Sequence, residues 1–329
     1  MTNNKPKKIY IILPIVALVL LSGFLFRKQL AVLAFDVFFS GHVEKKLEGS
    51  YEPIEGAQPT PETVIKGPDA KPFSILLLGV DQRGKEVGRS DTIIYTVARP
   101  KDDKILMVSI PRDTYTEIVG KDKFDKINHA YAFGGKKMIM DSVSKLVDEP
   151  VNHYASINFQ GFIDVVDALG GVKLPIEKDI VNKAAEHEKF TVKGGKPIYS
   201  GQEALYYVRY REDDHLNRSS RNMIFVNAIL DRVTSLNQIS KIPALIDIMG
   251  SNFATDIEPK NMIDLAKDVF QADHQEIYSY TLKGEGGRKS NNIWYYIPDE
   301  KDVTYIHNLI DNWMDPDTKA ENLMVPQAE

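Results

Sequence analysis

The hydrophobic pattern of the chain begins with one long apolar run. Residues 9–26 contain no charged side chain; lysines precede the run, and Arg27 and Lys28 follow it. A membrane-spanning helix needs about 17–25 apolar residues, and a short basic tail favours a cytoplasmic N-terminus. The pattern therefore predicts a cytoplasmic tail over residues 1–8 and a transmembrane signal anchor over 9–28, in preference to a cleaved signal peptide. The rest of the chain would then lie outside the cell, as in a single-pass type II cell-membrane protein.

A proline-rich polar segment separates this anchor from the folded part of the chain. Five prolines lie between residues 50 and 72, among mostly polar neighbours. Such a composition is typical of a linker and not of a packed element. We therefore assign residues 29–72 to a juxtamembrane segment and stalk, and 73–320 to one extracytoplasmic domain.

Along the domain, the pattern of apolar residues is typical of strands in some segments and of helices in others. Apolar, β-prone runs predict strands over 75–80, 92–98 and 105–110, and a shorter strand over 172–176. Later segments carry apolar residues three and four positions apart, which predicts helices. These helices are expected over 136–147, 158–169, 217–236, from Pro259 onward and over 301–314, with one more starting at a Ser200–Glu203 capping box. Strands that alternate with helices predict α/β layers, and the polar, glycine-rich residues 284–292 predict a loop.

Composition narrows the function classes. The chain has 329 residues, of which 26% are charged and 43% hydrophobic, and a net charge of −5. This composition is that of a globular protein, and the negative charge argues against a general nucleic-acid binder. The absence of cysteine from the sequence excludes disulfides, thiolate zinc sites and a cysteine nucleophile.

Charged residues collect at the ends of the first predicted strands. They are Asp81, Arg83, Arg89, Asp91, Arg112 and Asp113. An open α/β sheet binds its ligand where strand ends and loops converge. Carboxylates suit Mg²⁺, and guanidinium groups suit phosphate oxygens. The sequence therefore predicts a site for a metal-bound pyrophosphate.

A second cluster of arginines lies about a hundred residues later in the chain. Its members are Arg209, Arg211, Arg218 and Arg221. Arg218 and Arg221 are three apart and share one face of the helix predicted from Asn217, whose N-terminus could help to hold a phosphate. Ion pairing of solvated arginines with Glu212, Asp213 or Asp214 is an equally good explanation, and this segment alone does not decide between the two.

These motifs resemble those of the LytR-CpsA-Psr family of bacterial cell-wall transferases. The resemblance is strong over residues 73–236, and the expected anchor and stalk also match the family plan. The matching stretches are LLLGVD and GRSDT (76–92), SIPRDT (109–114), KINHAYAFGG (126–135), INFQGFIDVVDALGGV (157–172) and SGQEALYYVRYR (200–211).

The resemblance implies a fold and a reaction. The fold would be an α-β-α sandwich with a central mixed sheet and a hydrophobic tunnel for a lipid tail. The reaction would move an anionic glycopolymer, with wall teichoic acid as the first candidate, from a polyprenyl-pyrophosphate carrier to the 6-hydroxyl of N-acetylmuramic acid in peptidoglycan, through a phosphodiester. The helices over 136–147, 158–169 and 217–236 could line such a tunnel, although ordinary core packing explains their apolar stripes equally well.

The resemblance also implies roles for individual residues. Asp81 and Asp91 match the acidic residues that hold Mg²⁺, with Mn²⁺ as an alternative metal. The positions that match arginines around the phosphates are Arg89, Arg112, Arg209, Arg211, Arg218 and Arg221. Asp113, together with Asp213 or Asp214, falls at acidic family positions, and one carboxylate, Asp81 or one of Asp213 and Asp214, would orient or deprotonate the sugar hydroxyl.

The sequence departs from the family pattern at two places. Asn222 stands where the family usually has glutamine, so that the amide is kept but its side chain is one methylene shorter. Asn217 stands where the family has glycine before the arginine pair. Two other functions remain open at this point: hydrolysis of a polyprenyl pyrophosphate by water, and non-catalytic regulation of envelope synthesis through binding of lipid phosphates.

Overall fold

The computed structural model describes residues 40–54, 70–81, 88–183, 188–210, 215–234, 245, 247–248, 252–271 and 276–326. The predicted cytoplasmic tail, the signal anchor and most of the stalk lie outside these ranges. None of the helices within them has the length and apolar character that a membrane span requires.

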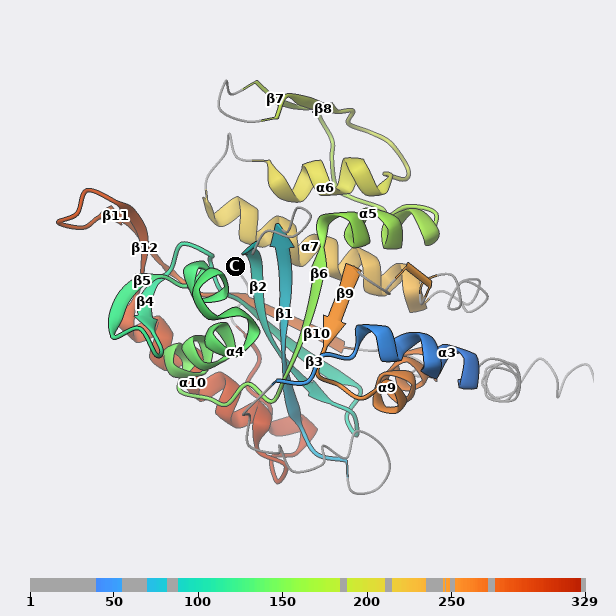
Figure 1. Cartoon of the computed structure of the whole chain (residues 1–329), viewed down its shortest axis with the longest axis horizontal. Coiled ribbons are helices and arrows are strands. Elements are labelled where there is room, and N and C mark those ends of the chain that lie inside the picture. Colours follow the sequence, from blue (N-terminus) through green and yellow to red (C-terminus); the bar gives the residue numbers. More distant parts are fainter. Residues whose placement is uncertain are drawn as a thin grey trace, which may run out of the picture.

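A six-stranded mixed sheet forms the centre of the molecule (Figure 1). Its order is β10–β3–β2–β1–β6–β9. The strands are β1 (Phe73–Asp81), β2 (Arg89–Arg99), β3 (Lys104–Ser109), β6 (His153–Asn158), β9 (Phe253–Thr255) and β10 (Glu276–Thr281). The pairs β1–β6 and β3–β10 are parallel, whereas β1–β2, β2–β3 and β6–β9 are antiparallel. The predicted mixed sheet and its first three strands are thus confirmed.

Helices cover both faces of this sheet. The α-helices of the described ranges are α3 (Ser40–Leu47), α4 (Asn128–Val147), α5 (Phe159–Ala168), α6 (Gly201–Arg209), α7 (His215–Thr234), α9 (Pro259–Gln271) and α10 (Glu300–Met314). Alternate residues of a strand point to opposite faces. In β1, Leu76 and Leu78 accordingly join the core with α4 and α10, whereas Leu77 packs with Met223 of α7 on the other face. Figure 1 shows α5, α6 and α7 grouped on the side opposite α4 and α10.

Several helix and strand boundaries differ from those predicted. Helix α4 starts at Asn128, before the predicted helix over 136–147, and is interrupted at Gly134 and Gly135, whose φ and ψ angles are not helical. The predicted helix follows this kink and is confirmed. The expected strand over 172–176 is wrong, since Val172 makes one isolated bridge with Tyr199. Its alternating side chains are nevertheless buried under α5 and α6, so the period-2 pattern reflects packing without a partner strand.

Three small hairpins complete the described structure. They are β4 (Tyr115–Ile118) with β5 (Lys123–Lys126), β7 (Ile180–Asn182) with β8 (Phe190–Val192), and β11 (Gly284–Arg288) with β12 (Trp294–Pro298). The prediction of a loop over 284–292 is therefore wrong for 284–288, which form β11, and confirmed for 289–292, which connect the two strands. A Cβ on Gly284 would lie 2.2 Å from the carbonyl oxygen of Ile297. The glycines that suggested a loop permit this close approach between the two strands.

Candidate functional site

The site begins with an irregularity between β1 and β2. Gly79 pairs with Thr92 and Val80 pairs with Ser90, so Asp91 is an extra residue in β2. A β-bulge of this kind changes the direction of a side chain at a strand end. A Cβ on Gly79 would lie 3.0 Å from the Cβ of Thr92, so glycine allows the two strands to approach closely here. The Asp91 side chain is 8% exposed and forms an ion pair with Arg112.

Arg112 and Asp113 follow β3 on a turn that is fixed by hydrogen bonds. The backbone N–H of Thr114 donates to the carbonyl of Pro111 (2.9 Å), and that of Asn128 donates to the carbonyl of Arg112 (3.2 Å). The start of α4 thus holds this segment in place. The sequence at the start of α4, KINHAY, belongs to one of the motifs named above. The hydrogen bond from Asn128 shows that this motif positions the Arg112–Asp113 segment.

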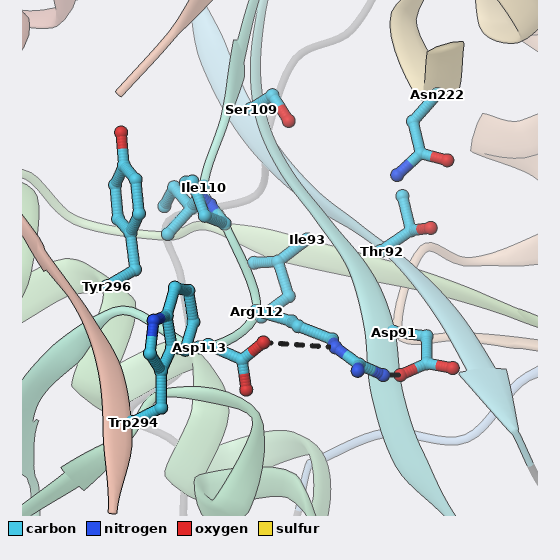
Figure 2. A pocket seen from close by; sticks show the side chains of 11 residues that line it. Asp91, Thr92, Ile93, Ser109, Ile110, Arg112, Asp113, Asn222, Trp294 and Tyr296 are labelled. Atoms are coloured by element: carbon cyan, nitrogen blue, oxygen red, sulfur yellow. Dashed lines mark hydrogen bonds and ion pairs between the residues drawn. The ribbon is translucent and has the colours of Figure 1, made fainter. Parts of the chain in front are cut away.

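The guanidinium group of Arg112 lies between two carboxylates, as Figure 2 shows. Its Nη1 contacts Asp91, and its Nε lies 3.4 Å from Oδ2 of Asp113. The other oxygen of Asp113 lies 2.8 Å from Nζ of Lys126. Burial acts to lower the pKa of Arg112, but the charges of Asp91 and Asp113 outweigh it, and the pKa is raised. Arg112 therefore remains a cation at any working pH.

A polar pocket opens beside this ion-pair cluster. Thr92, Ser109, Asn222, Trp294 and Tyr296 line it together with Asp91, Arg112 and Asp113. Asn222 comes from α7, more than a hundred residues after Arg112. One residue of the second predicted cluster thus lies in the same pocket as the first.

An apolar cavity of about 220 Å³ adjoins the polar pocket. Phe159 and Phe162 of α5, Val208 of α6, and Phe225 and Val226 of α7 line it. Thr92 and Asn222 line both spaces and form the boundary between them. An elongated apolar group can therefore lie in the cavity while an anionic head attached to it reaches Arg112.

The apolar stripes of the predicted helices do not all line this cavity, since some of their residues pack into the core. Part of the stripes over 158–169 and 217–236 lines the cavity, whereas Val166 of the first stripe packs in a core cluster with Val172 and Leu174. The stripe over 136–147 does not line the cavity, because Ile139, Met140 and Val143 of α4 pack into the main core on the opposite face of the sheet.

Two arginines of the second cluster lie near the cavity and are held by other groups. The Arg209 guanidinium lies 4.8 Å from the centre of the Phe159 ring, and its Nη1 lies 3.3 Å from Oε2 of Glu188. Arg221 is buried and donates from Nη2 to the carbonyl of Tyr210 (2.7 Å). Helix α7 starts at His215, two residues before the predicted start. Arg221 therefore lies in its second turn, and its predicted contact with a phosphate stays a prediction.

The other predicted site residues fall into two groups. Asp81 and Arg89 face each other in the register of β1 and β2, beyond the bulge, and neither is among the described residues that line the polar pocket. Outside the described residues are Arg83, Arg211, Asp213, Asp214 and the side chain of Arg218.

Sequence reasoning missed several residues of the pocket. Thr92 and Ser109 line the pocket and stand inside recognised motifs, so their positions were a usable signal. Trp294 and Tyr296 come from β12, which follows the segment predicted as a loop. Nothing in their local pattern indicates that the hairpin returns to the end of β3.

The donor set of the pocket fits Mg²⁺. Within the described ranges no three residues of the types His, Cys, Asp and Glu are grouped as a complete metal site. Mg²⁺ is usually bound by one or two carboxylates together with the phosphates of its substrate. The carboxylate of Asp91 and the oxygens of Thr92 and Asn222 are hard donors of this kind.

Comparison with known proteins identifies the family. The model of the LytR_cpsA_psr family matches residues 37–311. The chain belongs to the LytR_cpsA_psr family. All residues that line the two cavities lie within the matched part.

Relatives in this family are similar over most of their length. A Bacillus mycoides protein, named polyisoprenyl-teichoic acid–peptidoglycan teichoic acid transferase TagU, is 35% identical and aligns over 91% of this chain and 96% of its own. The protein of the same name from Bacillus licheniformis is 38% identical over 71% of this chain and 76% of its own.

Solved structures of family members share the fold. The crystal structure of TagV from B. subtilis has a TM-score of 0.65 and 30% identity, over 74% of this chain and 98% of that one. A structure of TagT bound to LIIa-WTA has a TM-score of 0.62 and 27% identity, over 80% of this chain and 99% of that one.

Proposed function

We propose that this protein is a membrane-anchored glycopolymer phosphotransferase. It moves an anionic glycopolymer, with wall teichoic acid as the first candidate, from a polyprenyl-pyrophosphate carrier to the 6-hydroxyl of N-acetylmuramic acid in peptidoglycan. The observation that carries the proposal is the junction at Thr92 and Asn222, where an apolar cavity meets a pocket that contains Arg112. The teichoic acid transferase names of its relatives support the choice of polymer.

The reaction exchanges one phosphorus–oxygen bond for another. The oxygen of the sugar hydroxyl bonds to the phosphorus that carries the glycopolymer, and the bond from that phosphorus to the oxygen of the lipid phosphate breaks. The hydroxyl proton passes to a carboxylate or to solvent, and the lipid phosphate leaves with the electron pair. Such a transfer depends chiefly on positioning and on neutralisation of charge.

The residues of the pocket can supply both requirements. Arg112 offers a permanent cation to the phosphate oxygens, and its two carboxylate neighbours fix the direction of its guanidinium group. Asp113, held by Lys126, can accept a hydrogen bond from the sugar hydroxyl and orient it. Thr92 and Asn222 can hydrogen-bond the phosphates where the lipid tail begins. Mg²⁺, held in this proposal by Asp91 and Asp81, would neutralise further negative charge on the pyrophosphate.

Replacement of Arg112 tests this proposal. In Arg112→Ala, transfer of glycopolymer from a lipid-pyrophosphate donor to peptidoglycan should fall by about a hundredfold or more, as after loss of other groups that stabilise transition-state charge. Arg112→Lys should retain part of the activity, because lysine keeps the positive charge but lacks the planar guanidinium group that donates two parallel hydrogen bonds. Product is measured as acceptor-linked polymer, and thermal unfolding checks the fold. Arg232→Ala is the control, since Arg232 binds the carbonyl of Leu169 away from both cavities.

The same assay separates the other functions. Release of lipid phosphate at an equal rate without peptidoglycan would identify a hydrolase. Binding of the donor without turnover in Mg²⁺ would identify a regulator. Full transfer activity in Arg112→Ala would contradict the proposed mechanism.

A further inference from the structure

A group of aromatic side chains lies next to the polar pocket. Tyr115 and Phe124 come from the β4–β5 hairpin, and Trp294 and Tyr295 come from β12. The ring centre of Tyr115 lies 5.4 Å from that of Phe124 and 4.9 Å from that of Tyr295. Trp294 lines the polar pocket itself. We call these four residues the aromatic platform. Phe124 is exposed, Tyr115 and Trp294 are partly exposed, and Tyr295 is buried and supports the other rings.

Phe124 is the outermost member of the platform, and its side chain is 57% exposed. Alternation along β5 explains its direction. Lys123 and Asp125 point toward α4, where they contact Phe133 and His129. Phe124 and Lys126 therefore point the other way, and the Nζ of Lys126 lies 5.9 Å from the ring centres of both Trp294 and Tyr295. Phe124 thus presents a large apolar surface to solvent next to the ring of Tyr115, and it is not part of the core.

The platform is joined directly to the Arg112–Asp113 segment. The backbone N–H of Tyr296 donates to the carbonyl of Asp113 (2.9 Å), and Thr114 forms a bridge with Tyr296. A molecule bound on the rings is consequently held at a fixed distance from the ion-pair cluster.

The platform and the apolar cavity lie on different sides of the polar pocket. Figure 2 shows Trp294 and Tyr296 on one side and Thr92 and Asn222, which border the cavity, on the other. In phosphoryl transfer the attacking and leaving oxygens lie roughly in line with the phosphorus. A lipid phosphate that leaves toward the cavity therefore requires an acceptor that enters from the side of the platform.

We propose that the aromatic platform binds the acceptor glycan, a strand of alternating amino sugars with carboxylate-bearing peptide stems; the inference rests on the proposed function. The C–H faces of sugar rings are apolar and weakly positive, so they stack on the negative faces of aromatic rings. Lys289, whose Nζ lies 4.5 Å from the ring centre of Tyr115, adds a positive charge beside the rings. That charge complements the carboxylates of the peptide stems.

Binding of soluble peptidoglycan strands to the full-length protein tests the inference. In Phe124→Ala the Kd for these strands, measured by isothermal titration calorimetry, should rise about tenfold, which is the loss expected for one interface anchor. The KM for the acceptor should rise by the same factor, and the KM for the lipid-linked donor should stay within about twofold. Phe124→Tyr should restore binding, because it keeps the ring.

The matched control is Phe133→Ala. Phe133 is also exposed, but it lies on α4 beside Lys123, away from the platform. Its removal should leave the Kd for the strands unchanged. Equal effects of the two alanine variants would contradict the inference, as would wild-type protein that binds no strands.

Two further outcomes distinguish this inference from the proposed function. A rise in the KM for the donor alone would show that the platform holds the donor polymer, which overturns the inference and leaves the transferase function intact. Strand binding that depends on Phe124 in a protein without any transfer activity would support the platform and contradict the transferase function.

Discussion

Arg112 has a different environment from that of an ordinary surface arginine. It is the centre of a row of charges in which Asp91, Arg112, Asp113 and Lys126 alternate in sign. Each cation in the row touches a carboxylate, so these side chains stay ordered before a substrate arrives. A pyrophosphate that enters would exchange some of these contacts for its own, and a metal ion near Asp91 would take part in that exchange.

This arrangement predicts a specific effect of Asp91→Asn. The amide keeps the shape of the carboxylate but removes a charged oxygen, so the Mg²⁺ concentration for half-maximal transfer should rise about tenfold or more. A titration of activity against Mg²⁺ measures this change. Asp102→Asn is the control, since Asp102 pairs with Arg99 near the opposite end of β2. A metal requirement that does not change in Asp91→Asn would remove Asp91 from the metal site.

Among the secondary-structure elements, α6 shows how local sequence supports the site. Ser200 caps this helix by accepting a hydrogen bond from the N–H of Glu203, whose carboxylate accepts one from the N–H of Ser200. The capped helix then presents Leu205 and Val208 to the apolar cavity. Burial acts to raise the pKa of Glu203, but its bonds to Lys196 and Ser200 outweigh it, and the pKa is lowered.

Ser200→Ala should lower the free energy of unfolding by about 1 kcal/mol near neutral pH, the usual cost of an N-cap. Because the pKa of Glu203 is lowered in the folded state, its contribution is complete above the ordinary glutamate pKa and is lost as the pH falls through the folded-state value. Ser200→Ala also removes the hydrogen bond that the Ser200 hydroxyl donates to this carboxylate (3.1 Å), so the difference in free energy of unfolding between wild type and variant should narrow in acid. Denaturant titrations at neutral and acidic pH measure it, and Ser200→Thr should retain most of the cap. A difference that grows in acid would contradict this account.

At the scale of the whole molecule, the apolar cavity depends on three helices that lie on one face of the sheet. Phe162 of α5 and Phe225 of α7 stack with ring centres 4.2 Å apart, and both line the cavity. The opposite face is filled by α4 and α10, which form a close-packed core with the sheet. One face of the sheet is thus closed by a packed core that stabilises the fold, and the other face has space for an apolar ligand.

Filling the cavity should affect only donors with long lipid tails. In Val226→Trp the larger side chain occupies space beside Phe225, and the KM for a long-chain polyprenyl donor should rise about tenfold. The KM for a donor with a short prenyl chain should change little, which makes chain length the internal control. Equal effects on both donors would indicate that the lipid tail lies elsewhere.

The sequence by itself determined the features that depend on neighbouring residues. Apolar, β-prone runs predicted the strands β1 to β3, the capping box predicted the start of α6, and the strand ends predicted Asp91, Arg112 and Asp113 as a charged group. These features can be predicted from the spacing of nearby residues, because backbone propensity and side-chain direction depend on the nearest few positions. The fold of relatives then extended the prediction to a mixed sheet with helices on both faces.

Only the tertiary structure decided which distant segments meet. The bulge at Asp91 depends on the pairing of β1 with β2, and the position of Asn222 at the boundary of the two cavities depends on how α7 crosses the sheet. The aromatic platform joins residues near 120 to residues near 295, and the local pattern carries no signal for either contact. Such contacts depend on how whole helices and strands pack together, so only the tertiary structure reveals them.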